Sequence, residues 1–86
     1  MYYVYIIKDE DGKIYRGYTA DLKRRIKEHQ NGRGGEYTKR WKKIILVYYE
    51  AYRSKKDAIE REQRLRQHKK GYAQLKRRIW RSLNEP

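Results

Sequence analysis

Two short runs near the start of the chain, residues 2–8 and 13–18, are rich in β-branched and aromatic side chains. Such runs are typical of β-strands, because branched and ring side chains pack well on a pleated surface. Between them lie four residues with turn chemistry, Asp9-Glu10-Asp11-Gly12. The arrangement predicts an antiparallel β-hairpin, whose register decides which side chains share a face of the sheet.

That register is critical for two tyrosines, Tyr5 in the first run and Tyr15 in the second. Side chains alternate between the two faces of a strand. A four-residue loop that pairs Lys8 with Lys13 would place the two tyrosines on opposite faces, whereas an odd-length loop or a bulge places them on the same face. Gly12 suits the left-handed conformation that odd loops require. We therefore predict an odd loop or a bulge near Gly12.

The remaining sequence predicts further elements that follow the hairpin in order. They are a helix capped by Thr19 and ending near Gln30, a Gly-rich basic loop over 32–40, an apolar strand over 43–50, a helix over 54–69 opened by a capping box at Ser54, and, after an interruption at Gly71, a helix over 72–81. Because the third strand is apolar on both faces, we expect it to be central or well covered. The sequence predicts one α+β domain over residues 1–86, with a three-stranded, mainly antiparallel sheet flanked by about three helices.

The chain is strongly basic, since 24 Lys and Arg residues against 11 Asp and Glu residues give its 86 residues a formal net charge of +13. A charge of this size makes nucleic acid the first candidate partner. A membrane is disfavoured, because the longest apolar run, over 44–49, is far shorter than the roughly 20 residues that span a bilayer. With no cysteine and no signal-peptide layout, we expect no disulfide, no thiolate metal site and a cytoplasmic location.

The first predicted helix carries a charged residue on its apolar face. Helical spacing places Arg25 on the same face as Leu22, Ile26 and His29. A guanidinium among inward-facing apolar side chains is costly unless an anion accompanies it. Arg25 is therefore either a residue that binds an anion or one whose stem packs at the edge of the face while its head reaches water.

The second long helix repeats this pattern with the opposite charge. Glu62 falls in the middle of an apolar face formed by Ala58, Ile59 and Leu65. A carboxylate in this position indicates a metal ligand, an acid–base group or an ion pair. The pair would join Glu62 to Arg25 or, at i,i+4 spacing, to Arg66. If Tyr5 and Tyr15 share a face of the sheet, we expect their side chains to point toward both the helix that carries Arg25 and the helix that carries Glu62.

The order and spacing of four sites are specific: Tyr3-Val4-Tyr5, then Tyr15-Arg16-Gly17, then Arg25, then Glu62. Together they resemble the GIY-YIG nuclease superfamily over about residues 2–79, and in particular its small stand-alone members, which are similar to the N-terminal nuclease domain of the excision-repair system. The chain departs from the family at Tyr3, where the motif has Gly, and at Tyr18, where some members have Lys. It also lacks the late Asn of some members.

The resemblance implies a metal-dependent endonuclease that hydrolyses DNA and is directed by structure rather than by sequence, with DNA repair among its expected roles. Glu62 would hold one Mg²⁺ or Mn²⁺ ion, and Arg25 would stabilise charge on the phosphate. Tyr5 or Tyr15 would accept a proton from the attacking water, and the family pattern favours Tyr15. His29 would orient a tyrosine or the phosphate, or would simply fill the helix face. No small-molecule cofactor is implied.

Basic residues in two segments are expected to hold the phosphate backbone. They are Arg33, Lys39 and Arg40 in the loop, and Lys76 and Arg77 in the last helix. Tyr37 would stack on an unpaired base, and Trp41 would either stack likewise or anchor the loop to the core. Gly17 precedes a helix start, where free N–H groups bind phosphate, although a simple bend is the alternative.

Two other classes of function compete with the nuclease. A basic module that binds DNA or RNA without cutting it would carry the same net charge, but it would need neither an inward-facing Arg25 nor an inward-facing Glu62. A recruitment protein that acts only with a partner would also suit a chain of this size. The natural substrate and the oligomeric state cannot be inferred from these residues.

Overall fold

The structure is a computed structural model that describes residues 1–85, so the last residue of the expected domain, Pro86, lies outside the described part. Seven elements follow one another: β1 (Tyr2–Lys8), β2 (Ile14–Thr19), α1 (Leu22–Gln30), β3 (Ile45–Tyr52), α2 (Lys55–Gln67), α3 (Lys69–Arg78) and α4 (Trp80–Asn84). The predicted α+β class is confirmed, with a three-stranded sheet that is antiparallel throughout. No helix within residues 1–85 is both long enough and apolar enough to cross a lipid bilayer.

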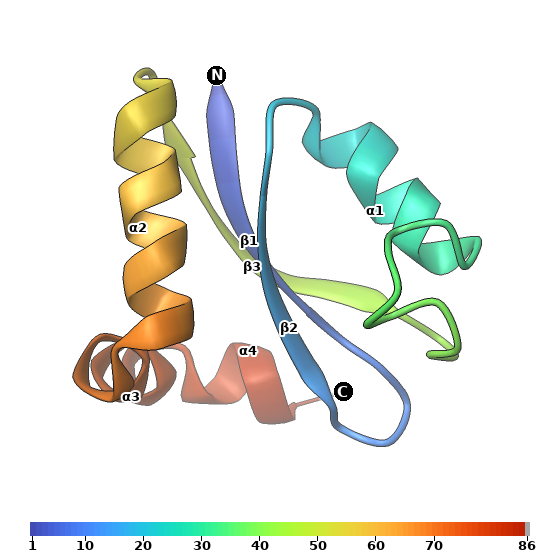
Figure 1. The fold of residues 1–86 in the computed structure, drawn as a ribbon. Helices are drawn as coiled ribbons and strands as arrows, with labels where there is room; N and C mark the ends of the chain where they lie inside the picture. Colours follow the sequence, from blue (N-terminus) through green and yellow to red (C-terminus); the bar gives the residue numbers. More distant parts are fainter. Residues whose placement is uncertain (86) are drawn as a thin grey trace.

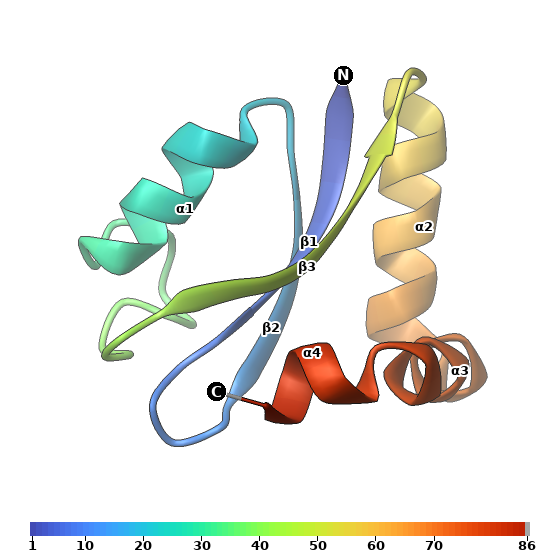
Figure 2. The ribbon, with the colours of Figure 1, turned by 180° about the vertical axis from the view of Figure 1, so that it is seen from behind.

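The sheet has the order β2-β1-β3, and helices cover both of its faces. α1 lies on one face and α2, α3 and α4 lie on the other (Figures 1 and 2). Because β1 is central and its side chains alternate, it contributes to two separate cores. Tyr5 and Ile7 pack toward α1, while Val4 and Ile6 pack toward α2. All four are almost completely buried.

The hairpin between β1 and β2 confirms the predicted odd loop. Lys8 pairs with Ile14, which leaves the five residues 9–13 in the connection. Gly12 has a φ of 83°, the left-handed conformation expected of it. The buried carboxylate of Asp9 accepts hydrogen bonds from the backbone N–H groups of Asp11 (3.1 Å) and Lys13 (2.8 Å), which holds the loop in shape. In this register Tyr15 pairs with Ile7 and so shares a face with Tyr5.

β3 is an edge strand, so it is not central; the alternative, a strand covered on its faces, holds in part, since Ile45 and Tyr49 remain exposed. Its pattern resembles that of a central strand because helices cover it on both faces. Leu46 packs in the core under α1, whereas Val47 and Tyr48 pack in the core under α2. The register shifts by one residue opposite Ile6 and Ile7, as at a β-bulge.

Two predicted helix boundaries are also wrong. Asp21, not Thr19, caps α1: its carboxylate accepts a hydrogen bond from the Arg24 N–H at 3.1 Å, while the Thr19 hydroxyl accepts one from the Asp21 N–H. Gly71 lies inside α3, and the break falls instead at His68, where the backbone is extended (φ −110°, ψ 111°). The chain has four helices within residues 1–85 against the expected three or so, because α3 ends at Arg78 and the short α4 follows it. Ser54 caps α2 as predicted.

Candidate active site

A buried histidine holds Tyr5 in place on the α1 face of the sheet. The Tyr5 hydroxyl lies 2.8 Å from Nε2 of His29, and Nδ1 of the same ring lies 2.8 Å from the Thr38 hydroxyl. Burial, followed by the positive charge of Arg25, lowers the pKa of His29 to about 4. The ring is therefore neutral near pH 7, and it donates one of these two hydrogen bonds and accepts the other. Sequence reasoning gave no sign of Thr38.

Two glycines make room for this arrangement. A Cβ atom at Gly17 would overlap the Tyr5 hydroxyl, and one at Gly34 would overlap the His29 ring. Gly17 lies on β2 directly opposite Tyr5, so the tyrosine ring reaches over it to the edge of the sheet. The structure thus accounts for Gly17 by side-chain packing. The start of α1 is less suited to phosphate, because the Asp21 carboxylate already caps its N–H groups.

Tyr15 stands beside this pair in a row of aromatic rings. Its ring centroid lies 5.3 Å from that of His29 and 5.9 Å from that of Tyr37. The Tyr37 ring in turn lies 5.7 Å from that of Trp41, which packs into the core under α1. Trp41 therefore anchors the loop to the core, one of its two expected roles. Tyr37 itself is 72% exposed.

Arg25 lies at the border between this cluster and solvent. Its guanidinium donates to the Gly34 carbonyl (2.8 Å) and to the Glu28 carboxylate (3.3 Å), and about a third of the side chain is exposed. Burial raises the pKa of Tyr5 to about 12, although the neighbouring Arg25 guanidinium acts to lower it. Arg25 and Tyr5 are thus close enough for each to affect the charge of the other.

Glu62 approaches the site from the other side of the sheet, because α2 covers the face opposite α1 (Figure 1). The expectation that the two tyrosines look toward both helices is therefore wrong: they face α1. Glu62 is buried, and its Oε1 lies 3.0 Å from Nε of Arg66, one of the two ion pairs considered from sequence. Its negative charge makes only a minor contribution to the raised pKa of Tyr5, after burial and the nearer charges.

β2 is an edge strand with residues near both groups. Gly17 of this strand leaves space for Tyr5 on one face, and Arg16 lies near Glu62 on the other. Burial raises the pKa of Glu62, while the charges of Arg66 and Arg16 act to lower it. The structure thus brings four of the predicted residues, Tyr5, Tyr15, His29 and Arg25, together on one face and places Glu62 on the other.

Glu62 is the residue of this site best able to hold a divalent cation. Within residues 1–85 there is no group of three or more carboxylate or histidine side chains suited to a metal. A single carboxylate fits Mg²⁺, which keeps several waters and takes one or two carboxylates. The half-exposed Arg66 is the only ion-pair partner of Glu62 among the described residues. A divalent cation could replace the Arg66 guanidinium beside Glu62, because the buried carboxylate would then still have a positive partner.

The residues expected to bind the nucleic-acid backbone fall into two groups. Arg33, Lys39 and Arg40 lie on the loop that follows α1, and Lys39 pairs there with Glu36 at 2.7 Å. Lys76 and Arg77 are exposed on α3, which lies on the other face of the sheet. The structure therefore brings the loop group, but not the α3 group, to the face that holds the two tyrosines.

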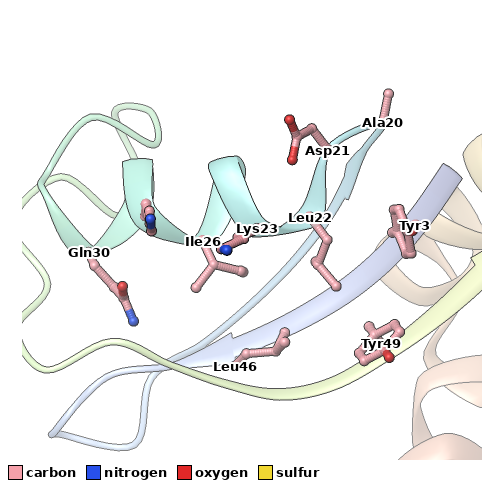
Figure 3. A pocket seen from close by; sticks show the side chains of 10 residues that line it. Tyr3, Ala20, Asp21, Leu22, Lys23, Ile26, Gln30, Leu46 and Tyr49 are labelled. Carbon is pink, nitrogen blue, oxygen red and sulfur yellow. The ribbon is translucent and has the colours of Figure 1, made fainter. Parts of the chain in front are cut away.

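A hollow of about 640 Å³ lies apart from this site. Figure 3 shows it between α1 and the sheet, where Leu22 and Ile26 of the helix face Leu46 and Tyr49 of β3. None of the predicted catalytic residues lines it. A smaller pocket of about 370 Å³ does adjoin the site, because Tyr15 forms part of its wall.

Comparison with known proteins identifies the family of the chain. A model of the GIY-YIG catalytic domain matches residues 1–76. UPF0213 proteins of Staphylococcus saprophyticus and Staphylococcus epidermidis are each 44% identical over 61 residues, which cover 71% of this chain and 74% of each relative. The solution NMR structure of a UPF0213 protein from Bacillus halodurans is 39% identical, with a TM-score of 0.53 over 87% of this chain and 82% of that chain.

The chain therefore belongs to the GIY-YIG family, as its two tyrosine motifs implied, and this membership points to a nuclease superfamily.

Proposed function

We propose that the chain is a divalent-metal-dependent endonuclease that hydrolyses phosphodiester bonds in DNA and recognises the structure of its substrate rather than a base sequence. The observation that carries the proposal is the pairing, around the Gly17 edge of β2, of a buried tyrosine–histidine–arginine cluster with a buried carboxylate. A module that only binds DNA has no use for a carboxylate near the phosphate, because two negative charges repel each other.

Tyr15 is the better candidate for the general base. Tyr5 is 1% exposed, its hydroxyl is already bonded to His29, and its pKa is raised to about 12, so it gives up a proton only with difficulty. Tyr15 is half-buried and lines an open pocket, where water and substrate can reach it. In this assignment Tyr15 acts as the phenolate, which takes a proton from the attacking water and becomes the phenol, and Tyr5 and His29 hold its ring in place.

Arg25 would bind a non-bridging oxygen of the scissile phosphate. A guanidinium has five N–H donors, and the structure uses only two nitrogens of Arg25, for Glu28 and Gly34. The remaining donors are available to stabilise the negative charge that grows on the phosphate during attack. Glu62 would hold Mg²⁺ or Mn²⁺, which when bound would stabilise charge on the phosphate and on the leaving 3′ oxygen.

The test is cleavage of branched, single-stranded and duplex DNA with Mg²⁺ or Mn²⁺ by the wild type, Glu62→Ala and Arg25→Ala. We expect each variant to cleave at least about a hundredfold more slowly, the usual effect of removing one group that stabilises a transition state. Glu60→Ala and Arg24→Ala are matched controls, since both side chains are exposed neighbours on the same helices. We expect both controls to cleave at close to the wild-type rate.

Undiminished cleavage by Glu62→Ala or Arg25→Ala, or cleavage that persists in excess EDTA, would refute the mechanism. The absence of cleavage on every substrate, with DNA binding intact, would instead favour the non-catalytic nucleic-acid-binding module. RNA substrates in the same assay decide whether DNA is the preferred nucleic acid.

A further inference from the structure

The pocket of about 370 Å³ next to Tyr15 has a wall chemistry that the proposed reaction does not use. Its lining is Ile14, Tyr15, Arg16, Tyr37 and Arg66, with two guanidinium groups, two phenol rings and no carboxylate. The volume falls in the range of small-ligand sites, roughly 300–1,000 Å³. Two positive charges beside aromatic rings match a nucleotide, which presents a phosphate and a flat base.

Arg16 lines this pocket and forms no close ion pair within residues 1–85, although its charge acts on that of Glu62. Its guanidinium carbon lies 4.3 Å from the centre of the Tyr72 ring, a cation–π contact that fixes the side chain. Among residues 1–85 its buried Nε has no hydrogen-bond partner, and no carboxylate forms an ion pair with it. Because this Nε is closed to solvent, an anion in the pocket would contact the terminal nitrogens of the guanidinium, which are not among the buried unsatisfied atoms.

Arg66 brings a second positive charge to the same pocket from α2. Its Nε pairs with Glu62, and about half of the side chain is exposed. The other two nitrogens of the guanidinium therefore remain available to a phosphate. Because this charge stands between the pocket and Glu62, it also separates a bound phosphate from the carboxylate and weakens their repulsion.

Tyr37 offers a stacking surface at the mouth of the pocket. Its ring is supported by Tyr15 at 5.9 Å and by Trp41 at 5.7 Å, yet most of its surface is open to solvent. A ring supported in this way loses little freedom when a base stacks on it. A base that stacks on Tyr37 cannot stay stacked between its neighbours in a duplex at the same time.

We propose that this pocket binds one unpaired nucleotide of a DNA strand, with its phosphate on Arg16 and Arg66 and its base on Tyr37. Since Tyr15 belongs both to the pocket and to the candidate active site, this nucleotide adjoins the scissile phosphate. The position of this nucleotide beside the scissile phosphate rests on the proposed nuclease function. It narrows the substrate class to DNA with an unpaired nucleotide beside the cut, such as a flap, a gap or a single strand.

The experiment measures binding in EDTA, without cleavage, by the fluorescence anisotropy of labelled oligothymidylate and of a duplex of equal length. Arg16→Gln and Arg66→Gln should each weaken binding of the single strand about tenfold, since each removes a charged hydrogen bond to phosphate. Tyr37→Ala should weaken single-strand binding about tenfold and leave duplex binding nearly unchanged, because only an unpaired base can stack. An oligouridylate arm tests whether RNA is bound equally well.

Arg64→Gln is the matched control, since Arg64 is exposed on α2 and does not line the pocket. The proposal is overturned if Arg16→Gln and Arg66→Gln bind no worse than Arg64→Gln. It is also overturned if Tyr37→Ala, whose exposed position leaves the fold undisturbed, weakens single-strand and duplex binding equally. If the variants lose single-strand binding but the wild type cleaves no DNA, the nucleotide pocket is supported and the nuclease function is refuted.

Discussion

His29 is the residue on which the candidate site depends most. It is completely buried, yet both of its ring nitrogens are hydrogen-bonded, so it can remain neutral in the core without leaving a polar atom unsatisfied. One bond positions Tyr5 and the other ties Thr38, and with it the basic loop, to α1. Among the roles considered for His29 from sequence, the geometry supports orienting a tyrosine, since a completely buried ring does not reach a phosphate.

The pKa of His29 predicts how stability depends on pH. Because the folded-state pKa is about 4 and the ordinary value is 6.5, the unfolded chain binds more protons between these values. The part of the free energy of unfolding that depends on a neutral His29 is therefore fully present above pH 6.5 and is lost as the pH falls toward 4. The loss is about 2 kcal/mol at pH 5. Urea unfolding of the wild type and of His29→Gln between pH 7 and 5 measures it.

The His29→Gln variant should lose this part of the pH dependence, whatever its stability at pH 7. His68→Gln, a change at an exposed histidine, should keep it. An equal pH dependence in the wild type and in His29→Gln would show that His29 does not titrate as the structure indicates.

At the scale of the elements, an ion pair between Glu50 of β3 and Arg61 of α2 connects the helix to the sheet. Glu50 accepts hydrogen bonds from Nε (2.9 Å) and a terminal nitrogen (3.0 Å) of Arg61, and from the hydroxyls of Tyr48 and Tyr52. Although burial acts to raise the pKa of Glu50, the bonds from Arg61 and the tyrosines lower it overall. Arg61 is therefore the residue through which Glu50 connects β3 to α2, beside the core packing of Ala58 and Leu65.

Removal of the charge from Glu50 should therefore destabilise the fold. Glu50→Gln weakens several bonds to one charged group, and we expect the free energy of unfolding to fall by about 2–3 kcal/mol in urea titration at pH 7. Glu85→Gln is the matched control, since Glu85 pairs with Arg81 at 4.0 Å on the surface and should cost less than about 0.5 kcal/mol. A change as small as that of the control would show that Glu50 does not fasten α2.

The elements were predictable from sequence to the extent that local chemistry decides them. The alternating strands, the left-handed Gly12 and the Ser54 cap depend on neighbouring residues, and the odd loop followed from requiring Tyr5 and Tyr15 to share a face. The position of β3 was not predictable, because an edge strand covered by helices on both faces has the same apolar pattern as a central one. Gly71 was misjudged because tertiary packing of α3 outweighs the helix-weakening effect of one glycine.

At the scale of the whole molecule, the net charge of +13 is divided between two sides. The loop residues Arg33 and Arg40 lie on the side of the two tyrosines, whereas Lys76 and Arg77 lie beyond the other face of the sheet. If both groups bind one DNA strand, the strand must pass around the β2 edge. A short strand can then reach the loop residues but not α3.

The salt dependence of binding tests this geometry. The slope of log affinity against log salt is negative, and each lost phosphate contact makes it shallower by about 0.7 for single strands. The double variant Arg33→Gln/Arg40→Gln should therefore make the slope shallower by about 1.4 for short and long strands alike. Lys76→Gln/Arg77→Gln should do so for long strands only, measured by anisotropy in EDTA. An unchanged slope in both double variants would show that other residues hold the backbone.

The sequence by itself determined the hairpin and its register, the basic charge, and the identity of the candidate residues Tyr5, Tyr15, Arg25 and Glu62, because each depends on local spacing or on composition. Only the tertiary structure decided how they meet. It placed Glu62 on the opposite face from the tyrosines. It also brought Thr38 and Gly34 to the site, since contacts between different segments of the chain follow from packing and not from any local pattern.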